Sequence, residues 1–127
     1  MKDLRSDCPF CELLDRPILA NRERAFCIAD RYPVSRGHSL IIPRRHVANF
    51  FELGADEMAE ICELLLEMRR KLAEVYSPGG FNVGINVGEA AGQSIWHVHV
   101  HLIPRYTGDV AEPRGGVRNV IPGMGPY

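Results

Sequence analysis

The stretch that decides the fold reads ADEMAEICELLLEMRRKLAEVY and covers residues 55–76. Its apolar side chains recur every three or four positions, a spacing that forms one continuous stripe along an α-helix. Asp56 and Glu57 lie in the first turn, where negative charge complements the helix dipole, and the segment SPGG (77–80) ends the helix. The sequence therefore predicts one long amphipathic helix over 55–76, with a stripe made of Met58, Ile61, Leu65, Met68, Leu72 and Val75.

Four predicted strands flank this helix in the sequence, two before it and two after it. They cover residues 24–29 (RAFCIA), 38–43 (HSLIIP), 81–87 (FNVGINV) and 95–103 (IWHVHVHLI). Residues 31–37 (RYPVSRG) predict a loop, and residues 8–14 predict a short helix that ends at Pro17. Because strands and helix do not alternate strictly, the pattern favours an α+β fold. We expect an antiparallel sheet of about five strands packed on the long helix.

The composition fits a single globular domain over residues 1–127, with 46% hydrophobic and 24% charged residues. The 15 basic and 16 acidic side chains leave no basic excess, which disfavours binding to long nucleic acids but permits a small phosphorylated ligand. No apolar run is long enough for a membrane span. The N-terminus MKDLRSDCPFCELL has charges where a signal peptide needs an apolar stretch, so we expect a cytoplasmic protein.

The C-terminal tail, residues 106–127, contains five glycines and three prolines and few side chains that could build a core. It cannot form a packed unit by itself. We expect it to lie over the domain or over a partner subunit, where Arg114 or Arg118 would cap a binding site, or to remain partly disordered.

The segment WHVHVHLIP, residues 96–104, carries three histidines at alternate positions. In a strand, alternate side chains point to opposite faces, so the intervening apolar residues would face the core. His97, His99 and His101 would then form a row on the other face, with about 6.6 Å between neighbours. Such a row has no packing explanation and indicates a functional site.

Two uses fit this row of imidazoles. One imidazole could act as a nucleophile while its neighbours orient it and handle protons, or two or more could converge on a metal ion. The loop GEAAGQS (88–94) lies directly upstream and is rich in backbone donors, which suits phosphate oxygens. Gln93 and Ser94 would add side-chain contacts. The chain has no G-x-x-x-x-G-K-[ST] pattern, which excludes a P-loop mechanism.

The stretch GQSIWHVHVHLIPRYTGD, residues 92–109, resembles the signature of the histidine-triad (HIT) family of nucleotide hydrolases and transferases. RGHSLIIPRRH (36–46) resembles the other marked segment of that family, and the likeness covers roughly residues 8–108. The resemblance implies a HIT-like fold, a two-fold homodimer that joins its sheets, and a small nucleotide as substrate. Diadenosine polyphosphates and nucleoside phosphoramidates are the substrate classes that it suggests.

The resemblance also implies roles for individual residues. His99 would attack the α-phosphorus of a nucleotide, and water would hydrolyse the covalent nucleotidyl-histidine. His38 and His101 would support His99, with His101 also close to the phosphate, and Asp30 would contact the ribose hydroxyls. The phosphate path is implied for Asn86, Gly92, Gln93, Ser94 and Ile95. A free imidazole has a pKa of about 6.5, so a neutral nucleophile is available near neutral pH.

The four cysteines fall into two pairs that are interpreted separately. Cys27 and Cys62 lie in apolar segments and are interpreted as small core residues. The segment CPFC (8–11) resembles a C-x-x-C found in one group of bacterial HIT proteins. In that group the two thiolates bind structural zinc together with histidines at the positions of His46 and His97. The resemblance therefore implies a zinc site made of Cys8, Cys11, His46 and His97, a reasonable donor set for tetrahedral zinc. The alternative is two spare thiols and a surface histidine.

Two other function classes remain open at this point. The same histidines could hold a catalytic ion in a zinc-dependent metallohydrolase, although no general-base carboxylate stands beside the row. The chain could also be a nucleotide-binding or interaction protein with little turnover.

Overall fold

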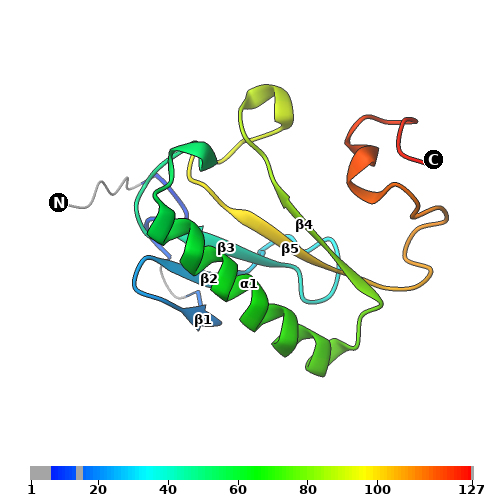
Figure 1. Ribbon diagram of the computed structural model, residues 1–127, viewed down its shortest axis with the longest axis horizontal. Coiled ribbons are helices and arrows are strands. Elements are labelled where there is room, and N and C mark those ends of the chain that lie inside the picture. The colour runs from blue at the N-terminus through cyan, green and yellow to red at the C-terminus, as the bar shows by residue number, and fades with distance from the viewer. Residues whose placement is uncertain (1–6, 14–15, 127) are drawn as a thin grey trace.

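The computed structural model of the protein describes residues 7–13 and 16–126. Its core is a five-stranded antiparallel sheet in the order β1-β2-β3-β5-β4 (Figure 1). The predicted α+β fold with an antiparallel sheet is thus confirmed. The strands are β1 (Ala20–Asn21), β2 (Ala25–Ala29), β3 (Ser39–Pro43), β4 (Gly80–Ile85) and β5 (Val100–Arg105). Three short 3₁₀ helices accompany them, η1 (Phe50–Glu52), η2 (Glu89–Ala91) and η3 (Gly116–Val120).

Helix α1 (Ala55–Tyr76) crosses one face of the sheet and has the predicted bounds (Figure 1). Its buried apolar residues are Ile61, Leu64, Met68 and Leu72, with Met58 and Leu65 partly buried. Val75 is 71% exposed, so its place in the predicted stripe is wrong. Tyr76, four positions after Leu72, continues the stripe in the last turn instead of Val75. The side chains of Leu72 and Tyr76 both lie against Gly37.

Gly37 is required where the chain enters β3. Its φ is +88°, and an added Cβ would lie 3.1 Å from atoms of Leu72, Tyr76 and Pro104. Any side chain would therefore strain the backbone and collide with the end of α1. The close approach fixes the position of the next residue, His38, which is buried directly before β3.

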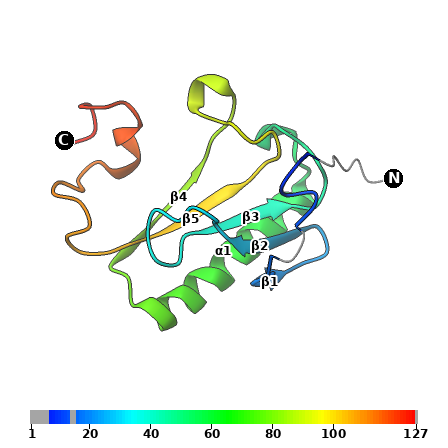
Figure 2. The same ribbon diagram turned by 180° about the vertical axis from the view of Figure 1, so that it is seen from behind.

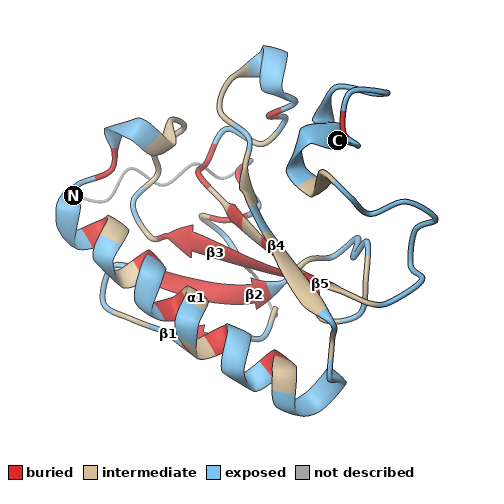
Figure 3. Cartoon of the chain, turned by 45° about the vertical axis from the view of Figure 1, so that its right-hand side comes forward, coloured by how far each residue is buried: buried red, intermediate tan, exposed pale blue. Residues whose placement is uncertain are grey.

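Two apolar clusters hold the two faces of the sheet, and buried residues concentrate on β2 and β3 (Figure 3). On the helix side, Cys27, Ile41 and Leu102 pack against α1. On the other side, the N-terminal segment 7–13 covers the sheet, where Phe10 joins Phe26, Ile28, Leu40 and Ile42 (Figure 2). Burial raises the pKa of the Cys27 thiol to about 12, as expected for a core residue. Cys62 is exposed, so its interpretation as a core residue is wrong.

The predicted helix over 8–14 is also wrong for the residues that the structure describes; residue 14 lies outside them. Residues 8–12 form a single turn, in which the N–H groups of Cys11 and Glu12 both donate to the carbonyl of Cys8 at 3.2 Å. The turn does not continue because both thiols face histidines from distant parts of the chain. Tertiary contacts therefore override the weak local helix preference.

The predicted strand over 95–103 is correct only in its second half. β5 begins at Val100, where both of its neighbours reach their last paired residues, Ile41 and Ile85. Before Val100 the chain bends away from the sheet, and the N–H of Val98 donates to the carbonyl of Val47 at 2.8 Å. Residues 97–99 are therefore not paired in the sheet, but the alternation continues through them, because Val98 lies in the same helix-side cluster as Val100 and Leu102.

None of the helices in the described part of the chain has the length and apolarity that a bilayer crossing requires. After β5, the tail turns back beside β4 and carries η3 (Figures 1 and 2).

Candidate functional site

The three histidines of the signature do not face one common ligand. His97 is fully buried and joins Cys8, Cys11 and His46, whereas His99 and His101 line a separate cavity. The three imidazoles therefore do not converge on one ligand, although the predicted alternation itself holds. Val98, Val100 and Leu102 all lie in the apolar cluster on the helix side, and the rings of His97 and His99 both contact Phe10 on the opposite side. The site consists of two neighbouring centres that share one short segment.

The cavity around His99 has a volume of about 520 Å³ and lies on the sheet face opposite α1. Three loops build it: the N-terminal turn with Phe10, the loop after β2 that includes Asp30, and the loop before β5. Most of the predicted substrate-binding residues line it, namely Asp30, Asn86, Gly92, Ser94, Ile95 and His101. It also includes residues that sequence reasoning missed, among them Phe10, Arg16, Arg31, Tyr32 and Val34.

Gln93 is the predicted substrate-binding residue that does not line this cavity. Its side chain is buried and holds the loop together instead. Its Oε1 accepts from the N–H of Gly88 at 2.9 Å, and its Nε2 donates to the carbonyls of Ala48 (2.8 Å) and Ile95 (3.2 Å). With all of these bonds made inside the protein, Gln93 shapes the loop beneath Gly92 and Ser94.

His99 has one ring nitrogen held by the protein and the other directed toward the cavity. Its Nδ1 lies 2.8 Å from the carbonyl oxygen of His97. Because a carbonyl can only accept, Nδ1 carries the proton and Nε2 of the neutral ring keeps its lone pair. The ring packs between those of Phe10 and His101, with centroid distances of 5.1 and 5.2 Å. This arrangement presents an oriented, unprotonated nitrogen to the cavity.

His38 and His101 form a chain of hydrogen bonds beside His99. The N–H of Val34 donates to Nδ1 of His38 at 3.1 Å, so Nε2 of neutral His38 carries the proton. That nitrogen donates to Nδ1 of His101 at 2.9 Å, which leaves Nε2 of His101 protonated as a donor. Asp30 Oδ2 lies 3.3 Å from Nε2 of His38 and 4.0 Å from Nδ1 of His101.

Burial keeps both of these imidazoles neutral at neutral pH. It lowers the pKa of His38, and the negative charge of Asp30 opposes this shift. The pKa of His101 is lowered to about 4, first by burial and then by repulsion from charge on His99 and His38, again against the effect of Asp30. In their neutral forms, His38 and His101 therefore keep the hydrogen-bond chain that begins at Val34.

The other centre consists of Cys8, Cys11, His46 and His97, whose ligand atoms all lie within 4.8 Å of one another. Nδ1 of His97 is 3.4 Å from Sγ of Cys8, 3.5 Å from Sγ of Cys11 and 3.2 Å from Nδ1 of His46. Sγ of Cys11 is 3.1 Å from Nδ1 of His46. Tetrahedral zinc with thiolate and imidazole ligands places its donor atoms about 3.4–3.8 Å apart. The donor distances of 3.1–3.5 Å lie within a few tenths of an ångström of that spacing, so these four residues fit the ion after a small adjustment.

The hydrogen bond made by the second ring nitrogen of His97 also supports a zinc site. Nε2 of His97 donates to the carbonyl of Pro43 at 2.7 Å, so Nδ1 directs its lone pair toward the two thiols. Histidines that bind metal commonly donate their second nitrogen to such an acceptor, which fixes the ring and the tautomer. The residues therefore match the implied zinc site in ligand type, spacing and outer hydrogen bond.

The two centres touch through Phe10 and through the backbone of His97. Phe10 lies between the two cysteines in the sequence and packs edge-on against His97, at 5.9 Å, as well as against His99. The carbonyl of His97 accepts from His99 while its imidazole belongs to the cysteine cluster. A disturbance of the cysteine cluster would thus reach the cavity directly.

Comparison with known proteins identifies the family. The family model described as HIT domain matches residues 14–108. The chain is 37% identical to Adenylylsulfatase HINT3 of Arabidopsis thaliana over 80% of this chain and 54% of the relative. It is 36% identical to AP-4-A phosphorylase of Mycobacterium tuberculosis over 72% of this chain and 48% of the relative. It thus spans about half the length of these two relatives.

A solved structure shows the same fold. It is described as a Zn-bound histidine triad family protein from Mycobacterium smegmatis, and it matches with a TM-score of 0.74 and 31% identity. The match covers 84% of this chain and 80% of that one. The chain belongs to the HIT domain family.

Proposed function

We propose that the protein is a nucleotide hydrolase in which His99 attacks the α-phosphorus of a nucleotide. The observation that carries this proposal is the orientation of His99, whose Nδ1 is committed to the carbonyl of His97 while Nε2 faces a cavity. A fixed lone pair at the wall of a cavity is what nucleophilic catalysis requires.

The reaction has two balanced steps. In the first, the lone pair of Nε2 forms a bond to the α-phosphorus, and the bond from phosphorus to the leaving oxygen or nitrogen breaks with its electron pair on the leaving group. A polyphosphate leaves as an anion, and an amine takes up a proton. In the second step, water adds its oxygen to phosphorus and releases a proton, and the P–N bond breaks with its pair returned to Nε2. The product is a nucleoside monophosphate.

The neighbouring groups support charge development on the phosphate. Nε2 of neutral His101 is a donor, and we assign it to a non-bridging phosphate oxygen. Ser94, Asn86 and the backbone at Gly92 and Ile95 line the cavity on the side of the loop before β5 and are assigned to the same phosphate. Asp30, at the opposite wall beside His38, is assigned to the ribose hydroxyls.

The substrate class follows from the chemistry of the cavity and from the relatives. Two relatives are named for adenylylated compounds, an adenylylsulfatase and an AP-4-A phosphorylase. We therefore assign dinucleoside polyphosphates or nucleoside phosphoramidates as substrates. The homodimer that the resemblance implies and the cytoplasmic location expected from the charged N-terminus remain predictions.

The cysteine cluster is assigned a structural role. Zinc held by Cys8, Cys11, His46 and His97 would crosslink the N-terminal turn to the segment before β5. The metallohydrolase alternative is disfavoured by the geometry: the imidazole of His97 turns into the cluster, whereas that of His99 turns into the cavity. These orientations do not support one catalytic ion held by both rings.

The test is to trap the covalent intermediate. Wild type and His99→Ala are mixed with diadenosine tetraphosphate or adenosine 5′-phosphoramidate, quenched within one turnover, and analysed by intact and peptide mass spectrometry. We expect AMP as product and an added AMP mass on the peptide that contains His99, in wild type only. Cys62→Ala, an exposed change on α1, is the matched control and should behave as wild type. Undiminished AMP release by His99→Ala would refute the proposal.

A further inference from the structure

A second cavity, of about 460 Å³, adjoins the first on the same face of the sheet. Val34, in the loop after β2, lines both cavities. The second cavity lies over the first half of β4 and the second half of β5, where Asn82 and Ile103 form its floor. Neither Asn82 nor Ile103 has a role in the proposed hydrolysis.

The floor continues without interruption from His101 into the second cavity. Along β5 the buried residues alternate with half-buried ones, so His101 and Ile103 share the open face about 6.6 Å apart. On the neighbouring strand, Gly84 pairs with His101 and Asn82 pairs with Ile103. An added Cβ at Gly84 would meet no atom within 4 Å, so no side chain stands between the two cavities at this position.

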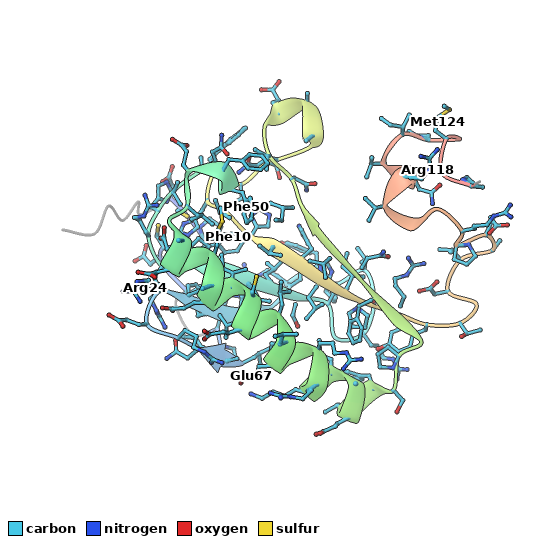
Figure 4. The ribbon with its side chains drawn as sticks, viewed as in Figure 1. Phe10, Arg24, Phe50, Glu67, Arg118 and Met124 are labelled. Carbon is cyan, nitrogen blue, oxygen red and sulfur yellow. The ribbon has the colours of Figure 1, made fainter. Side chains whose placement is uncertain are left out.

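The C-terminal tail forms the far wall of the second cavity. Pro113, Gly116 and Asn119 line it from η3 and the segment before it. Hydrogen bonds within the tail connect η3 to the last residues, because Arg118 donates to the carbonyls of Met124 (3.1 Å) and Gly125 (3.2 Å) (Figure 4). Neither Arg114 nor Arg118 is among the residues that line the His99 cavity, so the predicted arginine cap is not formed within the described chain.

The lining of the second cavity is nearly neutral and mixed in polarity. Arg105 is neutralised by Asp109, to which it donates two hydrogen bonds of 2.8 Å, and it also donates to Oδ1 of Asn82. Glu112 adds a negative charge. Because the charge of Arg105 is already balanced, this lining does not favour a phosphate group, whereas its apolar side chains and amides suit an uncharged base and ribose.

We propose that this second cavity binds the distal nucleoside of a dinucleoside polyphosphate, so that the substrate spans both cavities over Gly84. This inference rests on the proposed function and deepens it, because it favours the dinucleotide over the phosphoramidate as substrate. The phosphate chain crosses the open floor between His101 and Ile103, and the tail provides the wall that a mononucleotide never reaches.

The test compares two substrates in one variant. In Ile103→Glu a negative charge stands where the phosphate chain passes, and in the control, Val75→Glu, the same charge is placed at an exposed position on α1. KM for diadenosine tetraphosphate should rise at least about tenfold in Ile103→Glu. KM for adenosine 5′-phosphoramidate should stay within about twofold, as should both values in Val75→Glu. An equal rise for both substrates, or no rise for the dinucleotide, overturns the proposal.

A binding measurement separates this proposal from the proposed function. If wild type turns over neither substrate, the proposed function fails, and calorimetry with AMP and diadenosine tetraphosphate still decides the second cavity. Wild type should bind the dinucleotide more tightly than AMP, and Ile103→Glu should remove the difference. Equal affinities in wild type overturn the proposal. If Ile103→Glu does not fold, Gly84→Leu fills the passage at a position with open space and gives the same readout.

Discussion

His97 and His99 stand two residues apart and differ in which ring nitrogen is available. His97 donates from Nε2 to the carbonyl of Pro43, so its Nδ1 faces two thiols. His99 donates from Nδ1 to the carbonyl of His97, so its Nε2 faces a cavity. The nearest backbone carbonyl therefore decides the tautomer, and the tautomer decides whether the imidazole suits a metal ion or an electrophile.

The largest expected effect comes from replacing each histidine in turn. His99→Ala should lower kcat/KM by at least about 10⁴-fold, because it removes the nucleophile. Its metal content and its urea unfolding midpoint should remain close to those of wild type. His97→Ala should lose the metal and about 3 kcal/mol of unfolding free energy, since it empties a fully buried site. Activity, metal analysis and urea titration of both variants check this contrast, and identical profiles would contradict the separation of the two centres.

Metal removal should act on stability more than on chemistry. We expect about one zinc ion per chain. Free zinc at a thousandfold excess over its Kd should add about 4 kcal/mol to the unfolding free energy, and a chelator should remove that increment. Turnover should decline in part, because Phe10 and the carbonyl of His97 depend on the cluster.

The control for metal removal is Cys11→Ser, in which the chelator should have no further effect on stability. Thermal unfolding followed with and without chelator provides the measurement. Complete loss of turnover in chelated protein that is still folded would instead indicate a catalytic ion.

Acid should weaken the catalytic centre through His101. Its folded pKa of about 4 lies below the ordinary value, so between about pH 6.5 and 4 the unfolded chain binds more protons than the folded chain. The contribution of neutral His101 to the unfolding free energy is therefore fully present above about pH 6.5 and is lost as the pH falls toward 4. Asp30, His38 and His99 are the charged or titratable groups that face His101.

We expect the unfolding free energy to fall by about 2 kcal/mol from this residue between pH 7 and pH 5. His101→Gln should lack that part of the loss, whereas acid release of zinc would affect both proteins equally. Urea titrations of the two proteins at pH 7 and pH 5 measure the difference. Parallel losses in both would show that His101 does not carry this pH dependence.

Local patterns in the sequence were enough for part of the fold and of the site. The period of apolar residues and the SPGG terminator gave α1 its bounds, because both act within one or two turns of the chain. Alternation predicted correctly that Val98, Val100 and Leu102 face the helix, but not that β5 begins only at Val100, where the pairing with both neighbouring strands ends. The sequence did not show that the amide of Gln93 bonds inside the protein, because its partners, Gly88 and Ala48, can be identified only in the folded chain.

The sequence by itself determined that this chain has an α+β fold and three histidines grouped for chemistry, since residue type, periodicity and spacing are local properties. Only the tertiary structure decided which histidine serves which centre. That division depends on the carbonyl of Pro43 and on two thiols more than 80 residues away from His97 along the chain. Hydrogen-bond partners of this kind are brought together by packing, and packing is decided by the whole chain.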